Sequence, residues 1–162
     1  MEYAARMPRM PFLASLLGFL GLLPFLGCAA GTLLLPTEKA DTYLAALIAY
    51  GAVVLSFLGA VHWGFVLGAS QPTAPGSRLA LGVLPALAGW VALLLAAAIG
   101  QGAGLLILLT AFAATLYVEA RGARAGLVPR GYMLLRWIIG VAVLLILTAV
   151  TIVRFLGLNI NF

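Results

Sequence analysis

Three ionisable side chains interrupt long apolar stretches of this sequence: His62, Glu119 and Arg136. An ionisable group inside a membrane span is costly, and by default it suggests a functional site. His62 could relay a proton, ligate a metal or form a hydrogen bond with a quinone. Tyr132 stands four residues before Arg136, so the two share a helix face. In the functional interpretation, His62, Glu119 and Arg136 could line one polar pocket open to the cytoplasm. The candidate polar cluster consists of His62, Glu119, Tyr132 and Arg136.

Structural roles account for the same residues, and we favour them over chemistry. A neutral His62 can tie two helices together through one hydrogen bond. Glu119 can pair with Arg136 across the short loop that separates them. Removing one partner of such a pair would leave a buried charge uncompensated, which strongly destabilises a fold.

No metal or cofactor site is expected. His62 is the only histidine and Cys28 the only cysteine, so there is no ligand cluster with zinc spacing and no internal disulfide. A haem with two axial histidines would require a symmetric dimer. Because the sequence also has no nucleophile–base pair and no phosphate-binding loop, we do not expect an enzyme.

The composition is that of a membrane protein. Of the 162 residues, 65% are hydrophobic and 8% are charged, whereas soluble domains are about 25% charged. The net charge of +5 does not indicate a nucleic-acid partner, because the basic residues stand at the ends of apolar runs, where the positive-inside rule places them. We therefore expect the chain to be embedded in a lipid bilayer.

Five apolar runs can cross this bilayer, which takes about 20 residues each. They are separated by a polar turn at 36–41, a Pro/Gly loop at 71–77, a glycine-rich turn at 100–104 and a basic loop at 120–130. Pro24 is expected to kink the first run, and the short fourth run exits at Glu119. The fold class is thus an all-α membrane protein, a bundle of five transmembrane helices in a single domain, 1–162, with spans at about 11–35, 41–70, 78–99, 105–118 and 131–155.

The second run contains a stretch, Tyr50–Gly68, around which we expect the bundle to be organised. Small residues recur there every four positions and form a helix-packing stripe, at which another helix can approach closely. His62 lies near the opposite side, in line with Gly51, Leu55, Leu58 and Gly59. Both sides of this helix therefore have the pattern of a contact surface, and we expect the helix to lie at the centre of the bundle. The stripe consists of Ala52, Ser56, Ala60, Gly64 and Gly68.

The basic residues also predict the orientation. Lys39 and Arg154 fall on one side of the membrane, and the larger group falls on the other. By the positive-inside rule the N-terminus of this multi-pass protein is cytoplasmic and the C-terminus is on the outer, periplasmic, side. The cytoplasmic group consists of Arg6, Arg9, Arg78, Arg121, Arg124 and Arg130.

The first run also has features of a signal sequence that ends in a lipoprotein box at Gly27-Cys28. Phe25 stands where such boxes have an aliphatic residue, and Pro24 interrupts the approach. We therefore interpret the segment as a retained membrane helix.

Four segments resemble the transmembrane protein 69 family: 21–25 (GLLPF), 50–64 (YGAVVLSFLGAVHWG), 82–90 (GVLPALAGW) and 129–136 (PRGYMLLR). These are small five-helix proteins of bacteria, with a mitochondrial member in animals, and the family is a domain of unknown function. The resemblance implies a bacterial inner-membrane protein. By the family's pattern it also singles out His62, Trp63, Tyr132 and Arg136.

The sequence departs from that pattern at two positions. Glu119 stands where the family has an aspartate, which keeps the charge. Gly131 stands where a tryptophan precedes Tyr132, which weakens any role for an aromatic pair.

Three functions fit these features. The leading hypothesis is an accessory, structural or assembly subunit that packs against a larger bioenergetic membrane complex, because the chain is small and its second helix has two contact faces. The alternative is a small proton or solute transporter that uses His62, Glu119 and Arg136. A membrane enzyme or cofactor binder ranks lowest.

Overall fold

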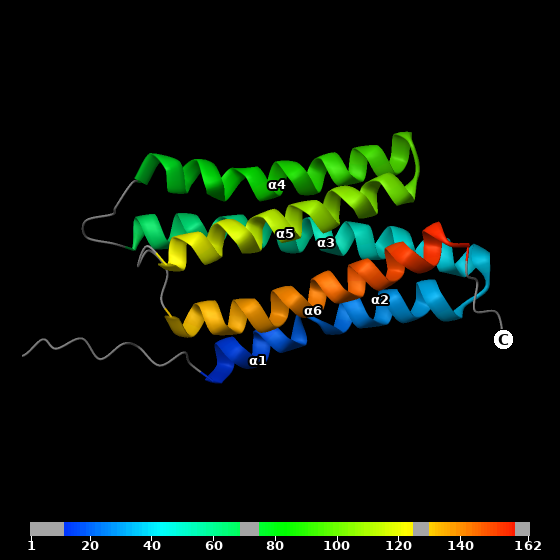
Figure 1. The fold of residues 1–162 in the computed structure, drawn as a ribbon, viewed down its shortest axis with the longest axis horizontal. Helices are drawn as coiled ribbons and strands as arrows, with labels where there is room; N and C mark the ends of the chain where they lie inside the picture. The colour runs from blue at the N-terminus through cyan, green and yellow to red at the C-terminus, as the bar shows by residue number, and fades with distance from the viewer. Residues whose placement is uncertain (1–11, 69–74, 125–129, 158–162) are drawn as a thin grey trace, which may run out of the picture.

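The computed structural model describes residues 12–68, 75–124 and 130–157. Every secondary-structure element in these ranges is an α-helix, and the helices run along the long axis of the molecule (Figure 1). The helices are α1 (Phe12–Leu20), α2 (Leu23–Leu34), α3 (Thr37–Leu67), α4 (Pro75–Ala98), α5 (Gln101–Arg124) and α6 (Arg130–Phe155).

Five segments are long and apolar enough to cross a membrane, which confirms the predicted fold class. Helices α1 and α2 together make the first span, and each later helix makes one span. Consecutive spans run in opposite directions, so one end of the bundle carries Arg78, Arg121 and Arg124. We call this the arginine-rich end; the start of α3, which contains Asp41, and the end of α6, which contains Arg154, lie at the opposite end (Figure 1).

The first span is broken between α1 and α2, at Gly21 and Leu22. Pro24 stands in the first turn of α2, where proline is tolerated because its missing N–H would have no helical partner. The break exposes backbone carbonyls, and the Tyr50 hydroxyl of α3 donates a hydrogen bond of 3.0 Å to the Gly21 carbonyl. The expected kink is thus a full interruption, held by a side chain from the neighbouring span.

Helix α3 is the centre of the packing, as the sequence predicts. It contacts α2, α4 and α5, and it is the most buried of the five spans. Its inward face carries the fully buried Leu47 and Leu55, which join a core with Leu108 of α5 and Leu147 of α6. Burial of this face removes large aliphatic side chains from lipid and fixes the order of the helices.

Glycines bring α3 and α4 into backbone contact. A Cβ added to Gly59 would collide with the carbonyl oxygen of Gly82, and one added to Gly89 would lie 3.0 Å from the backbone of Ala52. The two contacts are seven residues apart on each helix, a spacing typical of left-handed helix pairs. Trp63 covers Gly82 and donates its indole N–H to the Leu79 carbonyl at 3.2 Å.

Most of the predicted small-residue stripe does not pack inside the chain; the exception is Ala52, which meets Gly89 of α4. Only Ala52 is buried, whereas Ser56, Ala60, Gly64 and Gly68 are exposed. The expectation of two buried faces on α3 is therefore wrong within the chain. Helix α4 packs against Ala52 as well as Gly59, and α5 packs against Gly51 on the other face.

Helix boundaries differ from the predicted ones at three turns. The polar segment 36–41 is mostly helical, because Pro36 directly precedes the first turn of α3 and Glu38 favours its N-terminal dipole. The turn at 100–104 shrinks to Ile99–Gly100, where Gly100 has φ 131°. Helix α5 continues past Glu119 to Arg124, so the fourth span is longer than expected.

Candidate functional site

A buried ion pair joins α5 to α6 near the arginine-rich end. Arg136 Nε lies 2.7 Å from Glu119 Oε2, and the two residues are only 5% and 2% exposed. Gly140, one turn after Arg136, makes room for the guanidinium: a Cβ there would lie 3.1 Å from Arg136 Nη1. The pair is buried because α5 extends beyond Glu119, so that this residue stands within the length of the helix and not at its end.

Tyr132 belongs to the same cluster. It stands one turn before Arg136 on α6, and its hydroxyl oxygen is buried. The side chain interacts with both Glu119 and Arg136. The face shared by Tyr132 and Arg136, inferred from their spacing, therefore points toward α5.

His62 approaches this cluster from α3. It is half-buried, and its ring interacts electrostatically with Glu119. Nδ1 lies 3.3 Å from the carbonyl oxygen of Leu58 one turn earlier. Because a carbonyl only accepts, Nδ1 is the donor in this contact, and in the neutral form of the ring the lone pair is then on Nε2.

The structure thus brings the four residues of the candidate polar cluster together. A cavity of about 150 Å³ lies beside His62, between α3, α4 and α5. Its lining includes Leu84, Pro85, Ala88 and Thr115 but neither Glu119, Tyr132 nor Arg136. Of the cluster residues, His62 is therefore the one that lines this cavity.

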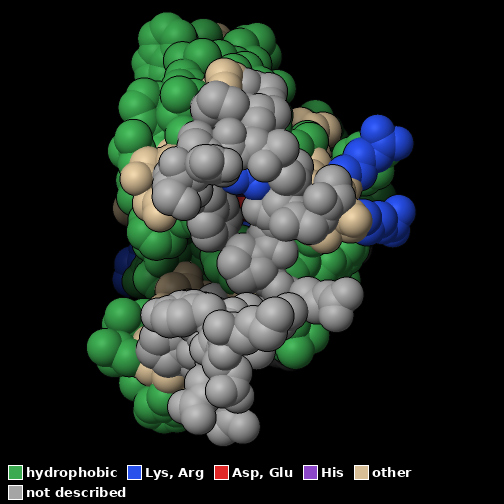
Figure 2. Space-filling model, turned by 90° about the vertical axis from the view of Figure 1, so that its left-hand side faces the viewer, with side chains coloured by type: hydrophobic (Ala, Val, Ile, Leu, Met, Phe, Trp, Pro, Cys, Tyr) green, Lys and Arg blue, Asp and Glu red, His purple; other side chains and the backbone are tan. Residues whose placement is uncertain are grey.

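Figure 2 looks onto the arginine-rich end. Basic side chains project from one edge, and most of the remaining coloured surface is hydrophobic. In the middle of this end, between the residues drawn in grey, a basic and an acidic side chain are visible. Arg121 stacks on an aromatic ring, since its guanidinium carbon lies 4.8 Å from the centre of the Tyr117 ring.

A second polar group lies at the opposite end, and sequence reasoning did not find it. Arg154 of α6 forms an ion pair with Asp41 of α3, and Gln101 of α5 donates a hydrogen bond of 3.0 Å to the Asp41 carbonyl. These residues border a cavity of about 450 Å³. The signal was present, because Arg154 and Asp41 are opposite charges that the topology assigns to the same side of the membrane.

No group of three or more His, Cys, Asp and Glu side chains that could hold a metal ion occurs among the described residues. Cys28 is half-buried in α2 with a free thiol.

Comparisons with known proteins agree with this architecture. A family described as "Protein of unknown function (DUF3429)" matches residues 10–152. The chain is 40% identical over 94 residues to Transmembrane protein 69 of Xenopus tropicalis, which covers 57% of this chain and 36% of that protein. It is 42% identical over 77 residues to Transmembrane protein 69 of Mus musculus, covering 46% and 30%. The matched segments thus span about a third of these relatives, and no solved structure matches the chain.

Proposed function

Because the chain belongs to the DUF3429 family, whose description assigns no activity, we propose a function from its geometry. The protein is an accessory or assembly subunit that packs against a larger membrane complex through the outward face of α3. It resides in a bacterial inner membrane with its arginine-rich end in the cytoplasm, an orientation supported by Arg78, Arg121 and Arg124.

The observation that carries this proposal is a line of small, exposed side chains along the outward face of α3. We call this line the α3 ridge; nothing lies within 4 Å of the position that a Cβ on Gly64 would take. Ser56 turns its hydroxyl back to the Ala52 carbonyl at 3.0 Å, so the ridge presents little polarity. The ridge consists of Ala45, Ala49, Ser56, Ala60 and Gly64.

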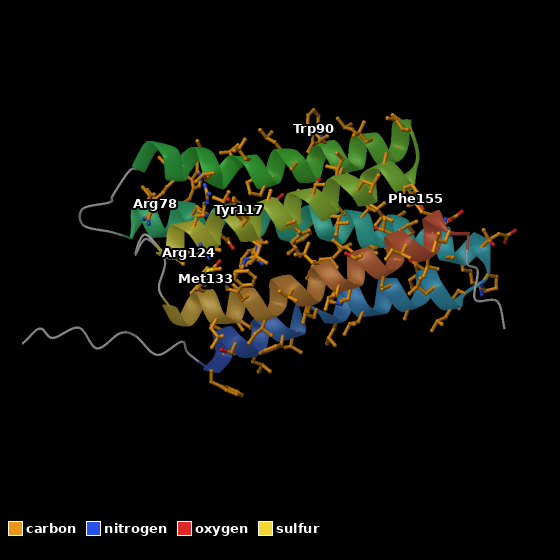
Figure 3. All side chains as sticks on the ribbon, viewed as in Figure 1. Arg78, Trp90, Tyr117, Arg124, Met133 and Phe155 are labelled. Atoms are coloured by element: carbon orange, nitrogen blue, oxygen red, sulfur yellow. The ribbon has the colours of Figure 1, made fainter. Side chains whose placement is uncertain are left out.

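Large side chains lie outward on the other spans, and on α3 itself Val53 and Phe57 flank the ridge and are 64% and 68% exposed. Leu84 and Trp90 of α4 are 57% and 58% exposed, and Leu134 and Leu145 of α6 are both 66% exposed. Trp90 points away from the bundle in Figure 3. Bulky apolar side chains suit contact with acyl chains, whereas small residues let helix backbones approach closely. The contrast favours a protein neighbour at the α3 ridge and lipid at α4 and α6.

The buried polar cluster supports a structural interpretation as well. Glu119 and Arg136 neutralise each other and are almost fully enclosed. A proton or solute transporter, the alternative function, requires a water path to these groups, and the cavity beside His62 does not include them in its lining. The geometry therefore supports packing better than transport.

Affinity purification from membranes solubilised in mild detergent tests the proposal. The tagged chain should recover a stoichiometric membrane partner. Ala60→Leu and Gly64→Leu should lower that recovery about tenfold or more, which corresponds to roughly 1.4 kcal/mol of lost binding energy. Ala113→Leu, at an exposed small residue of α5, is the matched control and should leave recovery unchanged. A chain that runs alone as a stable monomer, or equal recovery with all variants, contradicts the proposal.

A further inference from the structure

The cavity beside His62 has the size of one six-membered ring. Its volume is about 150 Å³, and an apolar protein cavity of about 150 Å³ accepts benzene. Most of its wall is aliphatic, from Leu84, Pro85 and Ala88 of α4 and Ala114 of α5. Such a cavity excludes strongly hydrated molecules and accepts an apolar ring.

The cavity opens sideways toward the surface that faces lipid. Leu84 is 57% exposed and Ala114 is also exposed, so the rim between α4 and α5 is accessible from the bilayer. Helices α4 and α5 are held tightly at their connecting turn, where a Cβ on Gly104 would lie 2.7 Å from Ala96 Cβ. The cavity lies farther along both helices, toward the arginine-rich end, where their separation leaves room for His62 from α3.

The polar atoms at the cavity are acceptors. His62 uses its Nδ1 hydrogen on the Leu58 carbonyl, and in the neutral form of the ring this leaves the Nε2 lone pair as an acceptor. Thr115 uses its hydroxyl hydrogen on the Ala111 carbonyl at 2.8 Å. Pro85 has no N–H, so the carbonyl of Leu81, which also lines the cavity, loses its helical partner. A ligand that donates a hydrogen bond matches this set, and a ligand that only accepts does not.

From size, lining and acceptor set together, we propose that this cavity binds a six-membered aromatic ring that carries a hydroxyl group, with the hydroxyl donating to His62 Nε2. Two sources share this chemistry: small free phenols, and the reduced, quinol form of a membrane quinone. The site is independent of the packing role assigned to the α3 ridge, which lies on the opposite face of the same helix.

Binding is tested with 4-fluorophenol and 4-fluorotoluene, which have the same shape but differ in the hydroxyl. The full chain in lipid nanodiscs is titrated with each probe and followed by fluorine NMR. His62→Phe keeps a ring in place but removes the hydrogen-bond acceptor. It should therefore weaken the binding of 4-fluorophenol about fivefold, which is the effect of one neutral hydrogen bond. The same variant should leave the binding of 4-fluorotoluene unchanged. Comparing each probe across variants cancels its partition into lipid.

Two further variants fill the cavity. Ala88→Leu, inside it, and Ala114→Leu, at its rim, should abolish binding of both probes. Ala149→Leu, at an exposed position of α6, is the control and should leave the binding of both probes unchanged. Saturable 4-fluorophenol binding that survives both fillings, an equal loss of both probes in His62→Phe, or no saturable binding at all overturns the proposal.

A competition arm separates the two sources. A hydroquinone with one isoprene unit can place its ring in the cavity and its tail between Leu84 and Ala114. Displacement of 4-fluorophenol by this quinol, and not by the corresponding quinone, supports a membrane quinol as the ligand. No displacement by either supports small free phenols. Displacement by the quinone as strongly as by the quinol overturns the assignment of a donating ligand.

Discussion

Arg136 Nε on α6 lies 2.7 Å from Glu119 Oε2 on α5, with both side chains almost completely enclosed among apolar residues. This contact fixes the relative positions of the last two spans. It also explains how two charges that are expensive in an apolar surrounding are retained, because each compensates the other.

Breaking this ion pair should be among the most destabilising changes in the chain. Glu119→Leu or Arg136→Met alone leaves the other charge buried and unpaired, which costs about 3–5 kcal/mol. Combining Glu119→Leu with Arg136→Met removes both charges and should recover most of that loss. Reversible unfolding in mixed micelles measures the cycle. Additive losses in the double variant would show that the two residues do not act as a pair.

The glycine contact between α3 and α4 predicts a sharp difference between two glycine-to-alanine changes. A methyl group at Gly59 meets the backbone of Gly82, so Gly59→Ala should destabilise by about 1–3 kcal/mol through overpacking. Gly64→Ala, five residues later on the same helix, meets nothing within 4 Å. Thermal denaturation in detergent compares the two. Equal melting temperatures would contradict the Gly59–Gly82 contact.

The break in the first span depends on a single hydroxyl group. Tyr50→Phe keeps the ring against Phe25, whose centre lies 5.0 Å away, but removes the hydrogen bond to the Gly21 carbonyl. The free energy of unfolding should fall by about 1 kcal/mol. Hydrogen exchange should increase locally, at the end of α1 and the start of α2. An unchanged exchange pattern would mean that the hydroxyl does not hold the break.

The ion pair at the opposite end should behave differently, because it is open to water. Asp41 and Arg154 have side chains 49% and 25% exposed. Asp41→Asn should therefore cost less than about 1 kcal/mol, and the cost should shrink as salt is added. Unfolding measurements at low and high ionic strength test this. A large, salt-independent loss would indicate that Asp41 has a buried role.

The overall fold could be predicted because lipid imposes a simple rule. Each span must satisfy its own backbone and expose apolar side chains, so apolar runs count the helices directly. The ends were harder to predict. Charged residues such as Glu119 suggested a helix end, but pairing with Arg136 lets the helix continue into the interface.

The faces of α3 could not be assigned from sequence. Small residues occur on both sides of this helix, and a pattern on one helix does not reveal which side its neighbours occupy. The contact between Gly59 and Gly82 depends on two distant segments meeting in one register. The cavity beside His62 likewise depends on how α4 and α5 separate, which no local pattern encodes.

The central claim is that the α3 ridge faces a partner protein. The most direct measurement places a benzophenone-bearing residue at Ala60 and activates it by light in intact membranes. The account predicts one discrete cross-linked protein product at this position, and only lipid adducts when the same group replaces Ala113 of α5. Lipid adducts alone at Ala60, with the same pattern as at Ala113, would contradict it.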